Sequence, residues 1–318
     1  MKKKAKGKIV MVGAGFVGST IAYTAVVSGI ASEIVFVDVN RDKAEGEAMD
    51  MSHGLAYVKQ VDIRAGEYSD CKDADIVVIT AGINRKPGQS RLDLAKINVK
   101  IVQDVIVNVT KYTSDAIILV VSNPVDILTY FAQKISGLPR YQVIGTGTTL
   151  DTARFKYLIG KNCEVNVRNV HAYIIGEHGD SEVPLWSTAN IAGKPLEEFW
   201  ADSGKDGAVE KSKLIEDVRD AGAEIIKKKG ATYYGIGLAT TNILSAMLGN
   251  ENSVLTVSSV LDGEYGIKDV ALSLPSVVNV KGIDRIFNIN ISEDEQLMLN
   301  ESATKLKETI RQVENELK

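Results

Sequence analysis

Four short apolar runs in the first half of the chain alternate with longer segments of helical character. The runs cover residues 8–12, 34–37, 76–79 and 117–121. Residues 16–28 are mostly small and apolar, and residues 91–112 repeat apolar side chains at helical spacing. Apolar strands that alternate with helices are typical of a parallel sheet covered on both faces. The pattern therefore predicts a doubly wound α/β domain over residues 1–145.

The second half has longer charged helices and one segment of alternating polarity. Apolar and polar residues alternate from 253 to 280, and breaks at Asp262-Gly263 and Gly266 predict antiparallel hairpins. Ser292 and Glu295 form a capping box before a last helix. Its apolar stripe consists of Leu299, Ala303, Leu306, Ile310, Val313 and Leu317. Because no Pro/Gly-rich linker intervenes, we expect a mixed α+β domain over residues 146–318 that packs tightly against the first.

Composition narrows the class of protein. The 318 residues are 45% hydrophobic and 25% charged, as in an ordinary globular protein. The net charge of −4 argues against a nucleic-acid partner. The two cysteines, Cys71 and Cys163, are too few for a disulfide framework or a tetrahedral zinc site, so we expect free thiols, no metal and a cytoplasmic protein.

The start of the chain requires a check for a membrane segment. Five lysines precede Ile9, and no charged residue follows until after Ser32. Glycine, serine and threonine interrupt this stretch, so no continuous apolar run near 20 residues remains. We predict a buried strand followed by a buried helix, and no membrane association.

Gly13, Gly15 and Gly18 form a G-x-G-x-x-G run between the first predicted strand and helix. These glycines permit a tight turn, backbone approach to a pyrophosphate and close packing of helix on strand. Asp38 ends the second predicted strand, where a carboxylate can bind both ribose hydroxyls and would repel a 2′-phosphate. We predict a Rossmann-type site for NAD. The alternative is a turn that only packs a helix on a strand, with Asp38 solvated.

Histidine is scarce, which shortens the search for a base that titrates near neutral pH. The three histidines are His53, His171 and His178. His178 follows an apolar run, and the flanking glycines Gly176 and Gly179 leave its ring accessible, as suits a catalytic position at a strand end. We expect His53 only to satisfy the end of a helix.

Asp151 and Arg154 lie three residues apart, which would place them on one face of a helix. Asp151 could orient a catalytic histidine, and Arg154 could bind a substrate carboxylate through two parallel hydrogen bonds. A surface ion pair without chemical function has the same spacing. Spacing alone does not decide between these two interpretations.

Several motifs in this order resemble those of the L-lactate and malate dehydrogenase family over nearly the whole chain. They are residues 13–18, Ile79-Thr80-Ala81-Gly82, Lys86-Pro87-Gly88 with Arg91-Leu92-Asp93-Leu94, Val121-Ser122-Asn123-Pro124-Val125-Asp126, Leu150-Asp151-Thr152-Ala153-Arg154 and residues 174–180. The resemblance implies a dehydrogenase that transfers hydride between NADH and a 2-keto acid.

The resemblance also implies a role for individual residues. His178 would be the acid/base, Asp151 its partner and Arg154 the carboxylate clamp. Arg91, carried by a lid over about residues 82–93, would polarise the substrate carbonyl. Asn123 would bind the substrate oxygen, and Thr232 would line the pocket. The implied dinucleotide contacts are Gly13, Gly15, Phe16, Val17, Gly18, Asp38, Thr80, Ala81, Gly82, Val121 and Asn123.

One lid position departs from the lactate branch, which most of the sequence resembles. Arg85 stands where lactate dehydrogenases usually carry Gln and malate dehydrogenases carry Arg. A charge-assisted contact to a second carboxylate would favour oxaloacetate by roughly tenfold to a hundredfold. We therefore expect a lactate-type enzyme, acting on pyruvate, that Arg85 shifts toward oxaloacetate, with malate dehydrogenase as the alternative. An arginine that points outward and ignores the substrate is the other interpretation.

Regulation and assembly are expected only by analogy with the family. Lys156 and His171 occupy positions where related bacterial enzymes present Arg and His to fructose bisphosphate. Because lysine lacks the bidentate fork of arginine, activation by this sugar is a hypothesis. Lactate-type sequences favour homotetramers. Other classes with the same architecture are NAD-dependent glycosidases and proteins that bind NAD without catalysis.

Overall fold

The computed structural model describes residues 7–83 and 90–317, and its first half is built on six parallel strands. These are β1 (Lys8–Val12), β2 (Glu33–Val37), β3 (Asp62–Ala65), β4 (Ile76–Ile79), β5 (Ile117–Val120) and β6 (Val143–Gly145). Their order across the sheet is β3-β2-β1-β4-β5-β6. Every residue of β1, β4 and β5 is buried, as expected for strands covered on both faces. The predicted doubly wound parallel sheet is confirmed.

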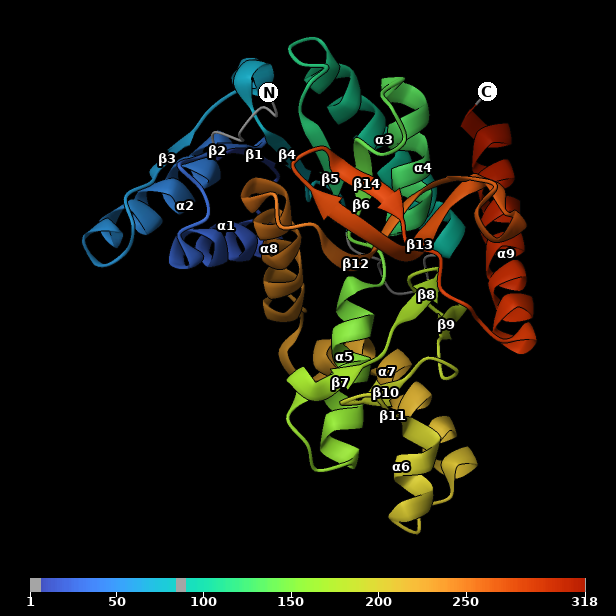
Figure 1. Ribbon diagram of the computed structural model, residues 1–318. Helices are drawn as coiled ribbons and strands as arrows, with labels where there is room; N and C mark the ends of the chain where they lie inside the picture. Colours follow the sequence, from blue (N-terminus) through green and yellow to red (C-terminus); the bar gives the residue numbers. More distant parts are fainter. Residues whose placement is uncertain (1–6, 84–89, 318) are drawn as a thin grey trace.

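Helices cover both faces of this sheet (Figure 1). They are α1 (Phe16–Ser28), α2 (Arg41–His53), α3 (Arg91–Thr110) and α4 (Val125–Ser136). Alternate residues of β1 belong to different cores: Ile9 and Met11 pack toward α1 and α2, whereas Val10 and Val12 pack toward α3 and α4. The predicted helix over 91–112 ends at Thr110, two residues early.

The second half continues the same sheet with antiparallel strands. These are β8 (Ile174–Gly176), β9 (Glu182–Pro184), β12 (Ser253–Asp262), β13 (Lys268–Asn279) and β14 (Gly282–Ile286). Strand β12 joins β6 through the pair Ser258 and Gly145, and β13 joins β8 through Ser273 and Gly176. The predicted hairpin is confirmed, and the φ of 124° at Gly263 explains the glycine in its turn.

A lobe below the sheet contains further helices and short strands of the second half (Figure 1). It consists of α5 (Thr149–Asn162), α6 (Leu196–Asp202), α7 (Gly207–Lys229) and the short strands β7 (Val170–His171), β10 (Asn190–Ile191) and β11 (Lys194–Pro195). Its core forms around the buried rings of Phe155 and Trp200. Among the described residues, the 3₁₀ turns are η1 (Leu55–Tyr57), η2 (Tyr68–Asp73), η3 (Val167–Asn169) and η4 (Glu264–Gly266).

Two helices of the second half return to the sheet. Helix α8 (Tyr234–Gly249) joins the core beside α1 and α2, and α9 (Glu293–Leu317) joins the core beside α3 and α4. The predicted capping box is present, because Ser292 N–H donates to Glu295 Oε2 at 2.9 Å and Glu295 N–H donates to Ser292 Oγ at 3.2 Å. The predicted stripe of α9 is buried at Leu299, Ala303, Leu306, Ile310 and Val313.

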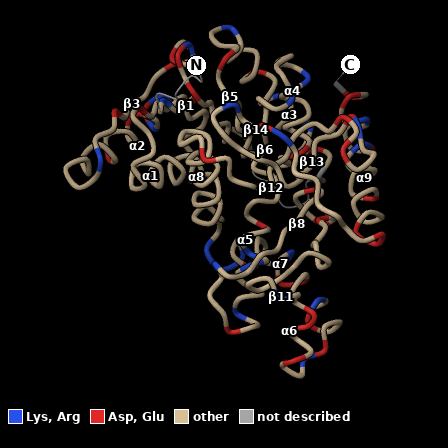
Figure 2. The backbone as a smooth tube through the Cα atoms, viewed as in Figure 1, with Lys and Arg blue, Asp and Glu red and all other residues tan. Residues whose placement is uncertain are grey.

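Acidic and basic residues are interspersed along α9 (Figure 2). Cys71 and Cys163 are both buried and unpaired with each other. Within residues 7–83 and 90–317, there is no helix long and apolar enough to span a membrane, and no cluster of side chains suited to a metal ion.

Candidate active site

The glycine loop between β1 and α1 can be built only with glycine at two of its three positions. A Cβ at Gly18 would lie 2.1 Å from the Gly13 carbonyl oxygen, and a Cβ at Gly13 would lie 2.7 Å from Thr80 Oγ1. The Thr80 hydroxyl donates to that same carbonyl at 2.9 Å. The Thr80 side chain, just after β4, therefore stabilises this conformation of the glycine loop.

Gly15 is different, because a Cβ there would meet no atom within 4 Å. Its φ of −78° is also one that any residue adopts, so the fold itself does not require glycine. Gly15 is the N-cap of α1, where no side chain caps the helix and no acidic residue lies in the first turn. Open space above the N–H groups of a helix N-terminus fits a dinucleotide pyrophosphate.

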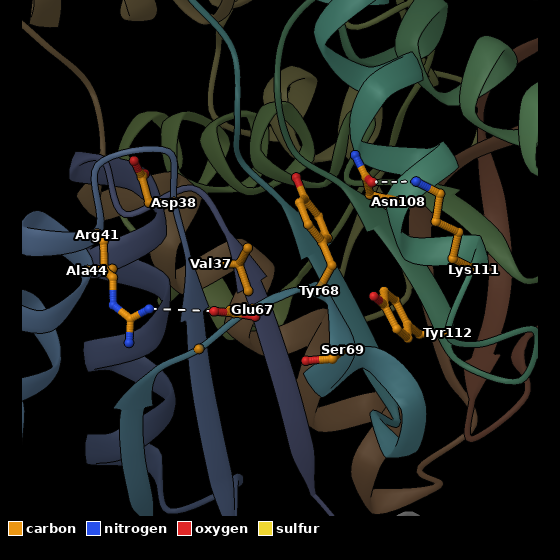
Figure 3. A pocket seen from close by; sticks show the side chains of 11 residues that line it. Val37, Asp38, Arg41, Ala44, Glu67, Tyr68, Ser69, Asn108, Lys111 and Tyr112 are labelled. Carbon is orange, nitrogen blue, oxygen red and sulfur yellow. Dashed lines mark hydrogen bonds and ion pairs between the residues drawn. The ribbon is translucent and has the colours of Figure 1, made fainter.

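Asp38 lies at the end of β2, beside the glycine loop. Its Oδ2 accepts from Ala14 N–H at 2.7 Å and its Oδ1 accepts from Asn40 N–H at 2.8 Å. A pocket of about 400 Å³ opens next to it, with Tyr68 and Lys111 across from Asp38 and Arg41 (Figure 3). A half-buried carboxylate at this edge has lone pairs left for ribose hydroxyls. The residues present therefore fit the adenosine end of NAD.

A buried amide that sequence reasoning missed connects the segments after β4 and β5. Asn98 on α3 is 1% exposed. Its Oδ1 accepts from Ile83 N–H at 2.9 Å, while its Nδ2 donates to Ile83 O at 3.2 Å and to Asn123 O at 2.7 Å. Its position four residues after Leu94, in the apolar stripe of the helix, was the signal that could have identified it.

His178 and Asp151 meet across the junction of sheet and lobe. Asp151 and Arg154 lie on one face of α5, as the spacing predicts, and His178 follows β8. Asp151 Oδ2 lies 2.5 Å from His178 Nδ1, and its Oδ1 accepts from Arg154 Nη1 at 2.9 Å. The exposed fractions are 3% for the Asp151 side chain, 19% for Arg154 and 27% for His178. This cluster is not a surface ion pair.

Charge sets the protonation of this cluster. The Asp151 carboxylate raises the pKa of His178 to about 9, against the effect of burial. Burial alone would raise the pKa of Asp151, but the charges and hydrogen bonds of His178 and Arg154 lower it. An imidazolium and a carboxylate are therefore the favoured forms near neutral pH, and because Asp151 contacts Nδ1, Nε2 is the nitrogen that could exchange a proton with a ligand.

Two further buried acids lie near His178, and sequence reasoning gave neither a role. Asp126, 2% exposed, accepts the His178 N–H at 2.7 Å, and burial raises the pKa of Asp126 to about 6. Glu182 on β9 has its Oε1 3.9 Å from Arg219 Nε, and burial raises the pKa of Glu182 to about 8. Asp126 lies in the first turn of α4, three residues after Asn123, so the segment that follows β5 contacts both the amide of Asn98 and the histidine.

The remaining predicted residues lie at scattered positions. Thr232 is in the link between α7 and α8, and Val121 and Asn123 follow β5. Arg85 lies outside the described residues, as does half of the expected lid, and Arg91 is the first residue of α3.

The expected effector residues lie in the lower lobe. Lys156 Nζ on α5 is 5.5 Å from the ring centre of Tyr173, and His171 is the exposed last residue of β7. His53 is the exposed last residue of α2.

The chain is similar to known proteins over almost its whole length. The lactate/malate dehydrogenase NAD binding domain matches residues 7–145, and the alpha/beta C-terminal domain of the same family matches residues 148–317. An L-lactate dehydrogenase of Acetivibrio thermocellus is 51% identical over 96% of either chain. L-lactate dehydrogenase 1 of Clostridium acetobutylicum is 51% identical over 98% of this chain and 99% of its own.

A solved structure is also similar to this chain over almost its whole length. The minor L-lactate dehydrogenase of Enterococcus mundtii, in its ligands-bound form, is 46% identical and has a TM-score of 0.94. The match covers 98% of this chain and 99% of that one. Similarity therefore extends through both halves of the chain.

Proposed function

The chain belongs to the lactate/malate dehydrogenase family, and on that premise we propose that it interconverts pyruvate and L-lactate. It is an NAD-dependent oxidoreductase, as are its relatives at about half identity, which carry the name L-lactate dehydrogenase. The observation that carries the proposal is the contact of 2.5 Å between His178 Nδ1 and Asp151 Oδ2, with Arg154 on the same carboxylate.

The proposed chemistry divides between the residues of the site. NADH supplies the hydride when it is bound. The His178 imidazolium donates a proton from Nε2 to the substrate carbonyl oxygen, and Asp151 stabilises its charged form. Arg154 binds the substrate carboxylate, with its remaining N–H groups free of Asp151. Asn123 binds the substrate oxygen, Thr232 lines the pocket, and Arg91 polarises the carbonyl.

We assign the dinucleotide to the edge where the parallel strands end. The glycine loop and the first turn of α1 would hold the pyrophosphate, and Asp38 would hold the adenosine ribose. The segments after β4 and β5 would line the nicotinamide side. The proposed contacts are Gly13, Gly15, Phe16, Val17, Gly18, Asp38, Thr80, Ala81, Gly82, Val121 and Asn123.

Replacement of His178 by Asn tests the function directly. The variant loses the proton donor, so kcat for pyruvate reduction should fall by about 10²–10⁴-fold. NADH binding, measured by fluorescence, should stay at the wild-type level because the ring lies outside the glycine loop. His53→Asn at the exposed end of α2 is the matched control. Retained turnover in His178→Asn on both pyruvate and oxaloacetate would refute the proposal.

Substrate preference is a separate proposal that rests on Arg85. We propose that its guanidinium binds the second carboxylate of oxaloacetate, so that Arg85→Gln lowers kcat/KM for oxaloacetate relative to pyruvate by about 10–100-fold. Arg168→Gln, at an exposed position on η3, controls for the loss of a positive charge. An unchanged ratio in Arg85→Gln would show that this arginine ignores the substrate.

Assembly, regulation and location complete the proposal. We propose a homotetramer in the cytoplasm, with a dinucleotide-binding domain over residues 1–145 and a substrate domain over residues 146–318. Buried free thiols support a reducing compartment.

Regulation is a further part of the proposal. Fructose bisphosphate would bind Lys156 and His171, of which His171 is exposed. If the sugar changes neither the KM for pyruvate nor the oligomeric state, that site should be abandoned.

A further inference from the structure

The link between α7 and α8, which carries Thr232, is bordered by a cluster of three aromatic rings and one cation. The Tyr233 ring stacks on Phe16 with ring centres 5.4 Å apart and planes inclined by 27°. It also meets the Tyr234 ring at 4.5 Å. Lys229 Nζ lies 3.6 Å from the centre of the Tyr233 ring and 4.0 Å from that of Tyr234. We call Phe16, Lys229, Tyr233 and Tyr234 the ring cluster.

The ring cluster brackets Thr232 on both sides. Lys229 is the last residue of α7, and Tyr233 is the residue before α8 begins. Their contact closes the short link between the two helices, since cation and ring attract each other across it. The position of Thr232 is therefore fixed relative to the Tyr233 ring.

The other face of the cluster belongs to the glycine loop. Phe16 directly follows Gly15 and is the first residue of α1, yet the residue is 71% exposed. The stack on Tyr233 joins its side chain to the second half of the chain. A shift of the α1 N-terminus would move the ring on which Tyr233 rests.

Close packing leaves the start of α8 little freedom to absorb such a shift. A Cβ at Gly237 would lie 2.6 Å from Thr20 Cγ2 of α1, and a Cβ at Gly235 would lie 3.1 Å from Leu150 Cδ1. Leu150 directly precedes Asp151. The first turn of α8 is therefore wedged between the helix that borders the dinucleotide site and the helix that orients the histidine.

We propose that Tyr233 is a positioning residue that couples dinucleotide binding at the glycine loop to keto-acid binding at Thr232. The inference rests on the proposed function and deepens it. Coupling between two ligands is reciprocal, so NADH should tighten binding of the keto acid by the same factor by which the keto acid tightens binding of NADH. Loss of the stack should reduce this factor rather than remove either site.

The test uses Tyr233→Leu, with oxamate, the amide analogue of pyruvate, as the probe. NADH fluorescence gives the affinity for NADH with and without saturating oxamate. We expect the coupling factor to fall about fivefold, while NADH affinity without oxamate changes less than about twofold. Tyr233→Phe, which keeps the ring and loses the hydroxyl, should restore the coupling. Tyr157→Leu, at an exposed position on α5, is the matched control.

A second variant separates loss of the stack from a local loss of structure around residue 233. Phe16→Leu removes the other half of the stack, and the double variant should lose no more coupling than either single variant, because both remove one contact. Wild-type coupling in Tyr233→Leu, or additive losses in the double variant, would overturn the inference. A wild-type chain that turns over neither pyruvate nor oxaloacetate would instead refute the proposed function.

Discussion

At the scale of single residues, the cluster of His178, Asp151 and Arg154 shows what sequence can and cannot identify. The scarcity of histidine and the spacing of Asp151 and Arg154 are enough to predict a candidate group. Asp126, Glu182 and Asn98 were missed because each pairs with residues that the fold alone brings near. Asn98 binds Ile83 and Asn123, which lie 15 and 25 positions away.

The raised pKa of His178 predicts the pH dependence of the reaction. Pyruvate reduction needs the imidazolium, so kcat/KM should stay level up to a pH of about 9 and fall above it. Lactate oxidation needs the neutral ring, so its kcat/KM should rise toward the same pH. Asp151→Asn removes the largest cause of the shift and should move both limbs toward lower pH. Profiles of both directions, measured between pH 5 and about 10.5, check this.

Asp126 should affect the same profile to a smaller degree. Its charge also raises the pKa of His178, after the contributions of Asp151. Asp126→Asn keeps an oxygen to accept the His178 N–H and removes only the charge. We expect the alkaline limb to shift to lower pH by less than in Asp151→Asn. An unshifted limb, together with a lower kcat, would mean that Asp126 acts by shape and not by charge.

Asn98 provides a prediction for stability. Asn98→Leu leaves the N–H of Ile83 and the carbonyls of Ile83 and Asn123 without their partner, which should cost about 2–4 kcal/mol of the free energy of unfolding. Because the same bonds hold Asn123, KM for pyruvate should rise as well. Urea unfolding and steady-state kinetics measure the two effects. Gln103→Leu, at an exposed position on α3, is the matched control.

At the scale of elements, periodicity located four of the six parallel strands to within a residue, since their apolar runs are short and sharply bounded. Strands β3 and β6 were not predicted. The short strands β7, β10 and β11 were not predicted, because two residues carry no period. The pairing of β6 with β12 was not predictable either. It rests on Ser258 and Gly145, which lie far apart in the chain and show no common pattern.

The glycine loop predicts that two similar substitutions affect different properties, the stability of the fold in one case and NADH affinity in the other. Gly18→Ala forces a methyl group against the Gly13 carbonyl and should lower the melting temperature. Gly15→Ala meets no neighbour, so the melting temperature should change little. Its methyl group would occupy the space assigned to the pyrophosphate, and NADH affinity should fall by about tenfold or more, equivalent to about 1.4 kcal/mol. Fluorescence titration and calorimetry separate the two outcomes.

At the scale of the whole molecule, one sheet runs through both halves, so the tight interface expected from the missing linker is a shared set of strands. The sequence indicated the two halves and their fold classes, but contained no sign of this continuity. Helices α1, α2 and α8 lie together on one side of the sheet (Figure 1). They expose Tyr23, Met49 and Leu238, which supports burial of this surface against another copy of the chain.

The proposed homotetramer can therefore be tested by placing a charged side chain in this exposed apolar surface. Sedimentation of the wild-type chain should give a particle of four times 34.4 kDa. Leu238→Asp places a carboxylate in the exposed apolar surface and should shift the particle toward dimers or monomers. Val209→Asp, at an exposed position near the start of α7, should leave the mass unchanged. A tetramer that survives Leu238→Asp would place the contact elsewhere.

Helix α5 spans two environments along a single rigid length. Its first turns carry Asp151 and Arg154, and the next turns insert Phe155 and Ile159 into the core of the lower lobe. Any rebuilding of that lobe for a new substrate would tilt the helix and misdirect the histidine's partner. Substrate range in such a protein is thus easier to diversify through the loops around the pocket than through its hydrophobic interior.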